Sequence, residues 1–369
     1  ETTRRETSVS LLFYKPAGQA SDLFKSLSGR ENSDIYIIFA ADKPPLRQAA
    51  SRHGSNKFVF APGLHCLCPE NNDTMESLKE LYKIGNGPSS SHTMGPKKAA
   101  ERFAERCHDA DAYRVTLYGS LAATGKGHLT DAAILSVLAS LAPTEIVWKP
   151  EVVLPFHPNG MLFEGLKAGN VADSWTIYSI GGGALANETS RLETPHSIYP
   201  LTTVSEIKAW CSHEGKTYWE YVTDCEGPEI WDYLDEIWTV MCETIQRGLN
   251  NDGVLPGGLK VARKASTYWV KSKSYTDSLK SRAQIYAYAL ATSEENASGG
   301  TVVTAPTCGS CGVVPAVLYH LANSRNFLRI RILRALATAG LFGNVAKTNA
   351  SISGAEVGCQ GEVGVACAM

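Results

Sequence analysis

The spacing of apolar residues changes part-way along the chain, and this change constrains the fold more than any other feature. Between residues 113 and 181 apolar and polar residues alternate in short runs such as YRVTLYG, MLFEGL and SWTIYSI. Alternation of this kind predicts half-buried strands. From Ile230 to Ile245 the apolar residues instead recur every three or four positions, which is typical of a helix. We therefore predict an α+β fold of two domains, an α/β domain followed by a helical one.

The predicted domain boundaries follow this change of pattern. We expect the α/β domain at residues 75–215, a linker at 216–227 and the helical domain at 228–369, with further helices at 276–296 and 326–342. Residues 1–74 combine the strand-like run DIYIIFAA with stretches rich in Pro, Gly and Asn, and we expect them to be an N-terminal extension. The segment MESLKELYKIG at 75–85 predicts a helix with one apolar face.

Charge and composition exclude several classes of function. A net charge of −2 supplies no basic field that would hold nucleic acid or an anionic membrane. The longest apolar stretch, residues 327–346, contains three arginines and does not suit a bilayer span. Ten cysteines lack the regular spacing of a secreted disulfide scaffold. These features predict a cytoplasmic protein that acts on a small molecule, although arginines and hydroxyl residues near the start leave an organelle-targeting segment open.

The segment GPSSSHTMGP at residues 87–96 is the strongest local feature. Its five consecutive polar side chains are Ser89, Ser90, Ser91, His92 and Thr93. They precede Pro96, from which the apolar spacing predicts a helix, so they are expected at a helix N-terminus, where free N–H groups attract an anion. An amino-acid carboxylate would fit there. The alternative is a helix cap, although a cap needs only one hydroxyl.

A glycine-rich loop, YGSLAATGKGHLTD at 118–131, follows the first predicted strand. It fails as a phosphate-binding loop, because five residues separate Gly119 from Gly125 and Gly127 replaces the required Ser or Thr. The loop does contain His128, whose side chain can titrate near neutral pH. On the residues alone, a structural role for this histidine is the alternative to a catalytic one.

Two groups of cysteines merit attention. Cys308 and Cys311 form a C-x-x-C pair, but neither a second such pair for zinc nor a thioredoxin-like context accompanies it. Cys359 lies among glycines in GAEVGCQGEVGVAC, where backbone and an iron–sulfur cluster could approach each other closely. The alternative is that Cys359 and Cys367 are packing residues.

Taken together and in order, these motifs resemble the iron–sulfur-dependent L-serine dehydratases. The matching segments are GPSSSHTMGP, YGSLAATGKGH, YSIGGG, GVLPGGLKV, EENASGGTVVTAPT and NASISGAEVGCQGEVGVAC, and the resemblance covers residues 75–369. It implies a β domain followed by a catalytic α domain that binds a 4Fe-4S cluster through three cysteines. In that family an iron atom binds the serine hydroxyl, a base removes the α proton, and the products are pyruvate and ammonia. The implied role is serine catabolism feeding gluconeogenesis.

The resemblance also assigns roles to individual residues. Cys359 corresponds to the first cluster ligand, and the remaining ligands are expected beyond Met369, so the chain is expected to be C-terminally truncated with an incomplete α domain. His128 corresponds to the base. The residues Ser89 to Thr93, including His92, become substrate-side residues at the meeting of the two domains, whereas Cys311 and Cys367 are not expected to be ligands.

We expect a homodimer that binds L-serine, with L-threonine as the nearest rival substrate. One alternative is a catalytically inactive fragment that binds an amino acid or a partner chain. Another is a pyridoxal-phosphate dehydratase, which predicts a visible Schiff-base absorption band when that cofactor is added.

Overall fold

The computed structural model describes residues 9–14, 35–40, 74–188, 197–350, 352 and 354–369. The chain divides into two compact units, Glu1–Cys66 and Leu67–Met369. In the first unit β1 (Val9–Tyr14) and β2 (Ile35–Ala40) pair in parallel, which confirms the strand predicted at DIYIIFAA. Every other described element belongs to the second unit.

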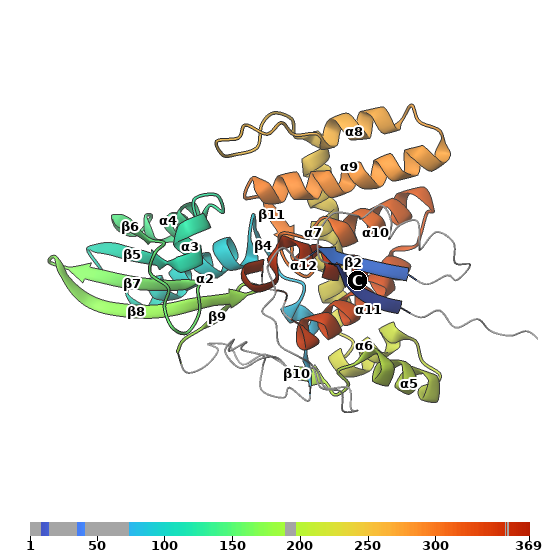
Figure 1. Ribbon diagram of the computed structural model, residues 1–369, viewed down its shortest axis with the longest axis horizontal. Helices are drawn as coiled ribbons and strands as arrows, with labels where there is room; N and C mark the ends of the chain where they lie inside the picture. The colour runs from blue at the N-terminus through green and yellow to red at the C-terminus, as the bar shows by residue number, and fades with distance from the viewer. Residues whose placement is uncertain (1–8, 15–34, 41–73, 189–196, 351, 353) are drawn as a thin grey trace, which may run out of the picture. The chain divides into compact units, whose positions relative to one another are not determined.

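A five-stranded sheet forms the first part of the second unit, in the order β6-β5-β7-β8-β9 (Figure 1). The strands are β5 (Ala112–Tyr118), β6 (Thr144–Lys149), β7 (Gly160–Lys167), β8 (Asn170–Gly181) and β9 (Ala184–Ala186). β6 is parallel to β5 and the other pairs are antiparallel. The alternating runs at 113–119, 161–166 and 174–180 are thus confirmed as strands.

Three helices pack against this sheet: α2 (Gly95–Arg106), α3 (Gly119–Thr124) and α4 (Thr130–Leu138). Phe103 of α2, Leu117 of β5 and Phe163 of β7 are fully buried in the shared core. The helix predicted from Pro96 is confirmed as α2. The run EVVLPF, predicted as a strand, forms none, because Pro150 precedes it and Pro155 interrupts it, and the Val152 carbonyl accepts a hydrogen bond from the Gly119 N–H at the start of α3.

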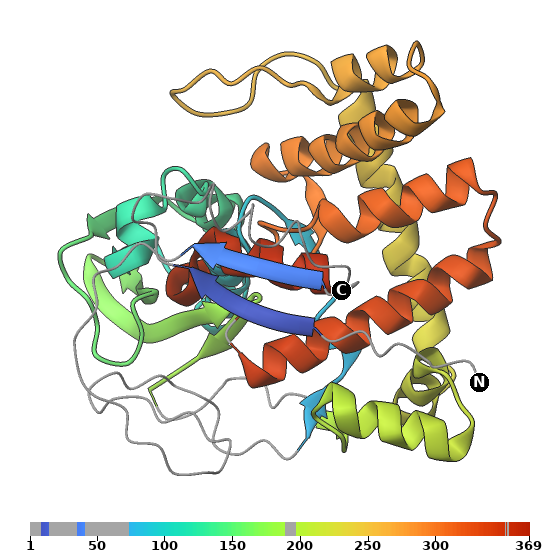
Figure 2. The same cartoon turned by 45° about the vertical axis from the view of Figure 1, so that its right-hand side comes forward.

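The second part is helical and is built around the long helix α7 (Ile230–Asn250). α9 (Asp277–Ala297), α10 (Val313–Ser324) and α11 (Arg329–Asn349) pack against α7, and α8 (Ala265–Ser272) lies beside α9 (Figure 2). α5 (Val204–Glu214), α6 (Tyr218–Glu226) and α12 (Gly354–Ala368) complete this part. The predicted helices starting near 230, 276 and 326 are confirmed, whereas α8 and α10 were not predicted.

A second prediction about local structure is also wrong. Residues 75–85 form β3 (Met75–Glu76), a 3-10 helix (Leu78–Glu80) and β4 (Ile84–Asn86) in place of one helix. β3 pairs with β10 (Ser197–Tyr199), and the Glu226 carboxylate accepts a hydrogen bond from the Leu78 N–H, so distant segments satisfy this backbone. The segment 216–227, whose role as a linker between domains stays a prediction, contains α6, and Tyr221 of this helix is buried in the helical core.

A short strand pair joins the two parts. β4 pairs antiparallel with β11 (Thr301–Val303), so that Asn86, just before the serine-rich segment, lies opposite Thr301. This pairing attaches the beginning of α2 to the end of α9. Within the described ranges, a search for helices long and apolar enough to cross a membrane finds none.

Candidate active site

The serine-rich segment lies at a helix start, as predicted. Residues Ser90–Met94 form one π-helical turn that runs directly into α2, and Ser89 caps it by accepting a hydrogen bond from the His92 N–H at 3.1 Å. Ser90, Ser91, His92 and Thr93 are all buried, with 3–7% of their surface exposed. Since Ser89 alone supplies the cap, capping does not account for the side chains that follow it.

His92 is held between two hydroxyl groups. Its Nδ1 lies 2.9 Å from Ser91 Oγ, and its Nε2 lies 3.1 Å from Ser120 Oγ at the start of α3. Burial, and then the nearby charge of His128, lower the pKa of His92 to about 4. The His92 ring is therefore neutral near pH 7 and relays hydrogen bonds between the two serines.

His128 lies next to His92, with the ring centroids 4.7 Å apart and the ring planes inclined at 38°. Its Nδ1 is 3.0 Å from the carbonyl oxygen of Thr124. A carbonyl oxygen only accepts hydrogen bonds, so Nδ1 must carry the proton. In the neutral ring Nε2 is then the unprotonated nitrogen, which is the tautomer that a general base requires.

Two crossed hydrogen bonds lock the serine-rich segment to the loop that carries His128. Thr93 Oγ1 donates to the His128 carbonyl oxygen at 2.7 Å, and Thr130 Oγ1 donates to the His92 carbonyl oxygen at 2.6 Å. Each hydroxyl comes from one segment and donates to the backbone carbonyl of the histidine in the other. The structure thus brings together the two motifs that were predicted separately.

Three neighbouring residues were missed as candidates for this site. Ser120 contacts His92, and the charge of His157 is the smallest of the influences that lower the pKa of His92. His157 Nδ1 accepts a hydrogen bond from the Asn159 N–H at 3.1 Å, which shapes the turn before β7. Asn159 is fully buried, and its Oδ1 has no hydrogen-bond partner among the described residues. The signal that could have found His157 and Asn159 is the sequence HPN itself, two turn-forming residues beside a histidine, whereas Ser120 has no such signal.

The cysteines differ sharply in their surroundings. Cys359 is exposed on α12, directly after a break at Gly358, where φ is 70° and ψ is 174°. Cys308 and Cys311 are almost fully buried, and burial raises the pKa of Cys311 to about 12 and that of Cys308 well above its usual value. The thiolate form that binds iron is therefore disfavoured at these two positions.

Among the described residues, a single cysteine is suited to bind an iron–sulfur cluster. The exposed thiol of Cys359 can meet a cluster, but a search of the described part of the chain for three or more clustered His, Cys, Asp or Glu residues that could hold a metal ion finds none. These residues supply one of the three thiolates that the resemblance implies.

Comparison with known families decides the affiliation. The family model of the serine dehydratase alpha chain matches residues 114–369, and that of the serine dehydratase beta chain matches residues 77–147. This chain belongs to the serine dehydratase family. The two matches overlap at 114–147, so they fix no boundary between domains, and the limits at 215 and 228 stay predictions.

Individual serine dehydratases resemble the chain over most of its length. It is 37% identical to L-serine dehydratase 2 and 38% identical to L-serine dehydratase 1 of Escherichia coli K12, over 80% of this chain and 77% of each relative. It is 37% identical to the L-serine dehydratase of Streptomyces coelicolor, over 79% of this chain and 76% of that protein. The prediction that the chain combines helices and sheets is confirmed. The prediction that it contains both a β-chain region and an α-chain region of this family is also confirmed.

Proposed function

We propose that this serine dehydratase is an L-serine ammonia-lyase, which converts L-serine into pyruvate and ammonia. The relatives described above are named for the dehydration of L-serine. The observation that carries the proposal is the His92–His128 pair beside the buried serine-rich turn, inside the matched family regions.

The serine-rich turn is suited to the carboxylate of the substrate. The turn is π-helical and continuous with α2. The partial positive charge at the N-terminus of a helix favours an anion. The hydroxyls of Ser90 and Ser91 add hydrogen-bond donors at the same place. Ser89 and Thr93 hold the turn itself, since Thr93 Oγ1 accepts from the Ser89 N–H at 3.2 Å.

His128 is suited to remove the α proton. Its Nε2 accepts the proton from Cα, and the resulting imidazolium keeps its Nδ1–H bonded to the Thr124 carbonyl. The Cβ–O bond then breaks, and the leaving hydroxyl takes up a proton from the His128 imidazolium and departs as water, which restores the neutral ring. The product, 2-aminoacrylate, tautomerises to an imine, and water hydrolyses the imine to pyruvate and ammonia.

The neutral state of His92 supports this assignment of the base. Two protonated rings 4.7 Å apart would repel each other, and the low pKa of His92 removes that repulsion near neutral pH. His128 can therefore accept a proton without a second positive charge beside it. His92 keeps Ser91 and Ser120 oriented meanwhile.

The cofactor proposed for this reaction is a 4Fe-4S cluster with Cys359 as one ligand. When bound, such a cluster supplies a Lewis-acidic iron for the hydroxyl that leaves. The exposure of the Cys359 thiol supports this role. The homodimer and the cytoplasmic location stay predictions.

Anaerobic reconstitution with iron and sulfide tests the proposal. With the full-length protein we expect bound iron and pyruvate production from L-serine, with L-threonine as a comparison substrate. His128→Ala is expected to abolish pyruvate production at unchanged iron content, whereas the control His213→Ala, at an exposed histidine on α5, should match the wild type. Full iron loading without any pyruvate would leave the inactive amino-acid-binding protein as the better account. An absorption band on adding pyridoxal phosphate, with turnover, would favour that chemistry instead.

A further inference from the structure

Asn296 is buried at the end of α9, where the helical part meets the serine-rich segment. Its side-chain Nδ2 donates to the Pro88 carbonyl oxygen at 3.0 Å, immediately before Ser89. Only 7% of its surface is exposed, and its Oδ1 has no hydrogen-bond partner among the described residues. A Cβ atom on Gly87 would lie 2.2 Å from this Oδ1, so the close approach depends on a glycine at 87.

The backbone beyond Asn296 holds the same segment from a second side. α9 ends at Ala297, and Gly299, two residues later, has a φ of +77°, in the left-handed region that follows many helices. The Gly299 carbonyl accepts from Asn86 Nδ2 at 3.1 Å, and the Gly300 carbonyl accepts from the Gly87 N–H at 3.0 Å. Residues 296–300 thus fix the backbone at 86–88, which leads into the serine-rich turn.

Residues 296–300 also contact the loop that carries His128. Leu129 follows His128 and adopts φ 56° and ψ 32°, a left-handed conformation that costs a leucine about 1–2 kcal/mol. A Cβ atom on Gly299 would lie 3.4 Å from Leu129 Cδ1, so the leucine side chain packs directly against this glycine. Strain of this kind persists only where its surroundings hold it in place.

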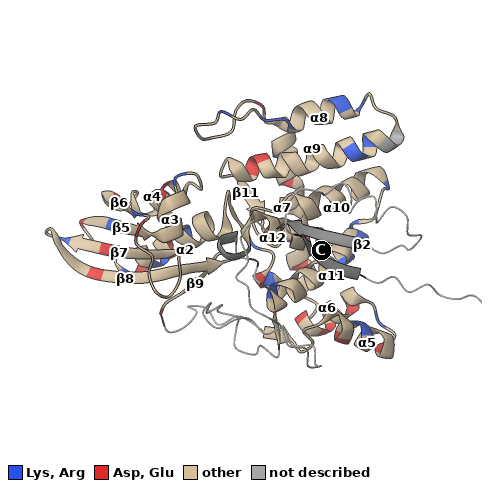
Figure 3. Cartoon of the chain, in the orientation of Figure 1, with Lys and Arg blue, Asp and Glu red and all other residues tan. Residues whose placement is uncertain are grey.

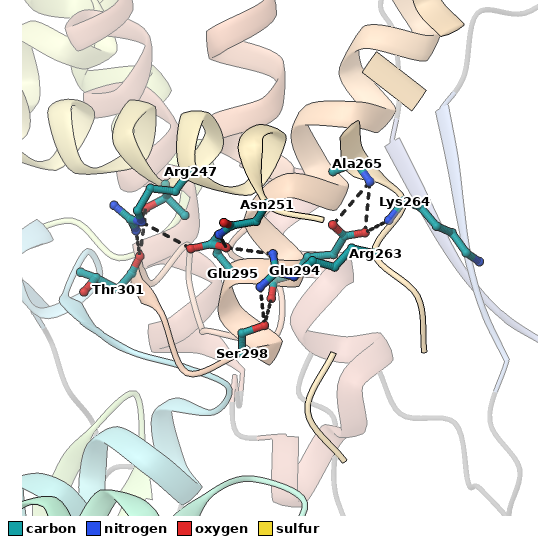
Figure 4. Close-up of polar contacts among 10 residues, drawn as sticks. Arg247, Asn251, Arg263, Lys264, Ala265, Glu294, Glu295, Ser298 and Thr301 are labelled. Carbon is teal, nitrogen blue, oxygen red and sulfur yellow. Dashed lines mark hydrogen bonds and ion pairs between the residues drawn. The ribbon is translucent and has the colours of Figure 1, made fainter. Parts of the chain in front are cut away.

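A buried acidic pair anchors the end of α9. Glu295 accepts hydrogen bonds from Arg263 at 2.9 Å and from Asn251 at 2.7 Å (Figure 4). Glu294 accepts from the backbone N–H groups of Lys264 and Ala265 at the start of α8. Figure 3 shows acidic residues on the last turns of α9, where these two glutamates lie. Because each carboxylate accepts more than one hydrogen bond, the last turn of α9 holds Asn296 in a fixed position.

We propose that Asn296 is a positioning residue for the dehydration reaction, which holds the serine-rich segment so that His92 stays in register with His128. It acts through the Pro88 carbonyl and does not touch the reacting atoms. The kinetic consequence of this inference rests on the proposed L-serine ammonia-lyase activity. Its structural consequence, a changed environment of His92 in the variant, does not depend on that activity.

Asn344 provides a matched control for a test by substitution. It is also buried, its Nδ2 also donates to a backbone carbonyl, that of Glu76, and its Oδ1 also lacks a hydrogen-bond partner among the described residues. Asn344 lies on α11, and its hydrogen bond goes to β3, which is neither of the two histidine segments. Asn296→Asp and Asn344→Asp each replace the donor by a carboxylate of the same shape, so their general cost to stability should be similar.

The kinetic experiment compares both variants after cluster reconstitution. We expect Asn296→Asp to lower kcat by about 10- to 100-fold with KM changed by less than about 3-fold, since small misplacements of reacting groups have effects of this size. Asn344→Asp should keep kcat within about 2-fold of the wild type. Equal losses of kcat in the two variants would assign Asn296 a merely structural role and overturn the inference.

A second readout needs no turnover. With ¹³C-labelled histidine, the resonances of His92 and His128 are followed by NMR against pH, and we expect Asn296→Asp to raise the pH at which His92 titrates, because water enters the loosened segment. Asn344→Asp should leave both resonances unchanged. If no variant, including the wild type, makes pyruvate but His92 still responds to Asn296→Asp, the proposed activity is wrong and the positioning role stands. An unchanged His92 titration overturns the role. Should Asn296→Asp not fold, Asn296→Ala is judged by the same two measurements.

Discussion

The buried ring of His92 should make the unit that contains it less stable at mildly acidic pH. Burial and the nearby His128 lower the pKa of His92 to about 4, whereas an unfolded histidine titrates at about 6.5. Between these values the unfolded chain binds a proton that the folded chain does not, so acid favours unfolding. The contribution is complete above the unfolded value and is lost as the pH falls toward 4. From the two pKa values, His92 alone should lower the free energy of unfolding by about 2 kcal/mol between pH 7 and pH 5.

Urea unfolding followed by tryptophan fluorescence measures this contribution. The wild type is compared at pH 7, 6 and 5 with His92→Gln, which does not titrate and keeps an amide that can reach Ser120. Other groups contribute equally to both proteins, so the difference between their pH dependences isolates His92. The control His213→Gln, at an exposed ring, should retain the wild-type pH dependence. Equal losses of stability in the wild type and His92→Gln on going from pH 7 to pH 5 would refute the reasoning.

Two further substitutions test the anchor and the proposed cluster ligand. Glu295→Ala should destabilise the protein by about 3 kcal/mol in urea unfolding, because it leaves the buried Arg263 guanidinium without its carboxylate. Lys167→Ala, at the exposed pair with Asp109, should leave the urea midpoint close to that of the wild type. Similar costs for the two would contradict the anchoring role. Cys359→Ser should reduce the iron bound after reconstitution without changing the melting temperature of the protein before reconstitution, because the thiol is exposed, and unchanged iron content would remove Cys359 from the proposed ligands.

The part of the fold that the sequence predicts is the part that local patterns determine. Alternation predicts the strands of the large sheet, and helical spacing predicts α2, α7, α9 and α11. The segment 75–85 has equally good helical spacing, and the residues of its predicted apolar face, Met75, Leu78, Leu81 and Tyr82, are indeed buried, yet it forms no long helix. Its strand β4 pairs with β11, more than two hundred residues later, and a local pattern contains no information about such a partner.

The residues of the candidate site also fall into those that the sequence predicts and those that it does not. The serine-rich turn and His128 stand out because several chemically capable residues are adjacent in the sequence. Ser120 and Asn296 do not stand out, because each reaches the site from another element: Ser120 through His92, and Asn296 through the Pro88 carbonyl. A single serine or asparagine in a helix has no signature of its own, so these roles become visible only when the elements are packed together.

The two histidines derive different properties from one packing arrangement. His92 is buried by the turn that it belongs to, and burial keeps it neutral, while His128 is only partly buried on a loop whose carbonyl fixes its proton on Nδ1. Both conditions require the serine-rich turn and the His128 loop to stay in contact. The crossed hydrogen bonds from Thr93 and Thr130 provide this contact within the sheet part. Residues 296–300 of the helical part contact both segments as well. A histidine that can accept a proton beside one that cannot is therefore a property of the joined parts, which is why a substitution at the end of α9 should change the titration of a ring on another helix.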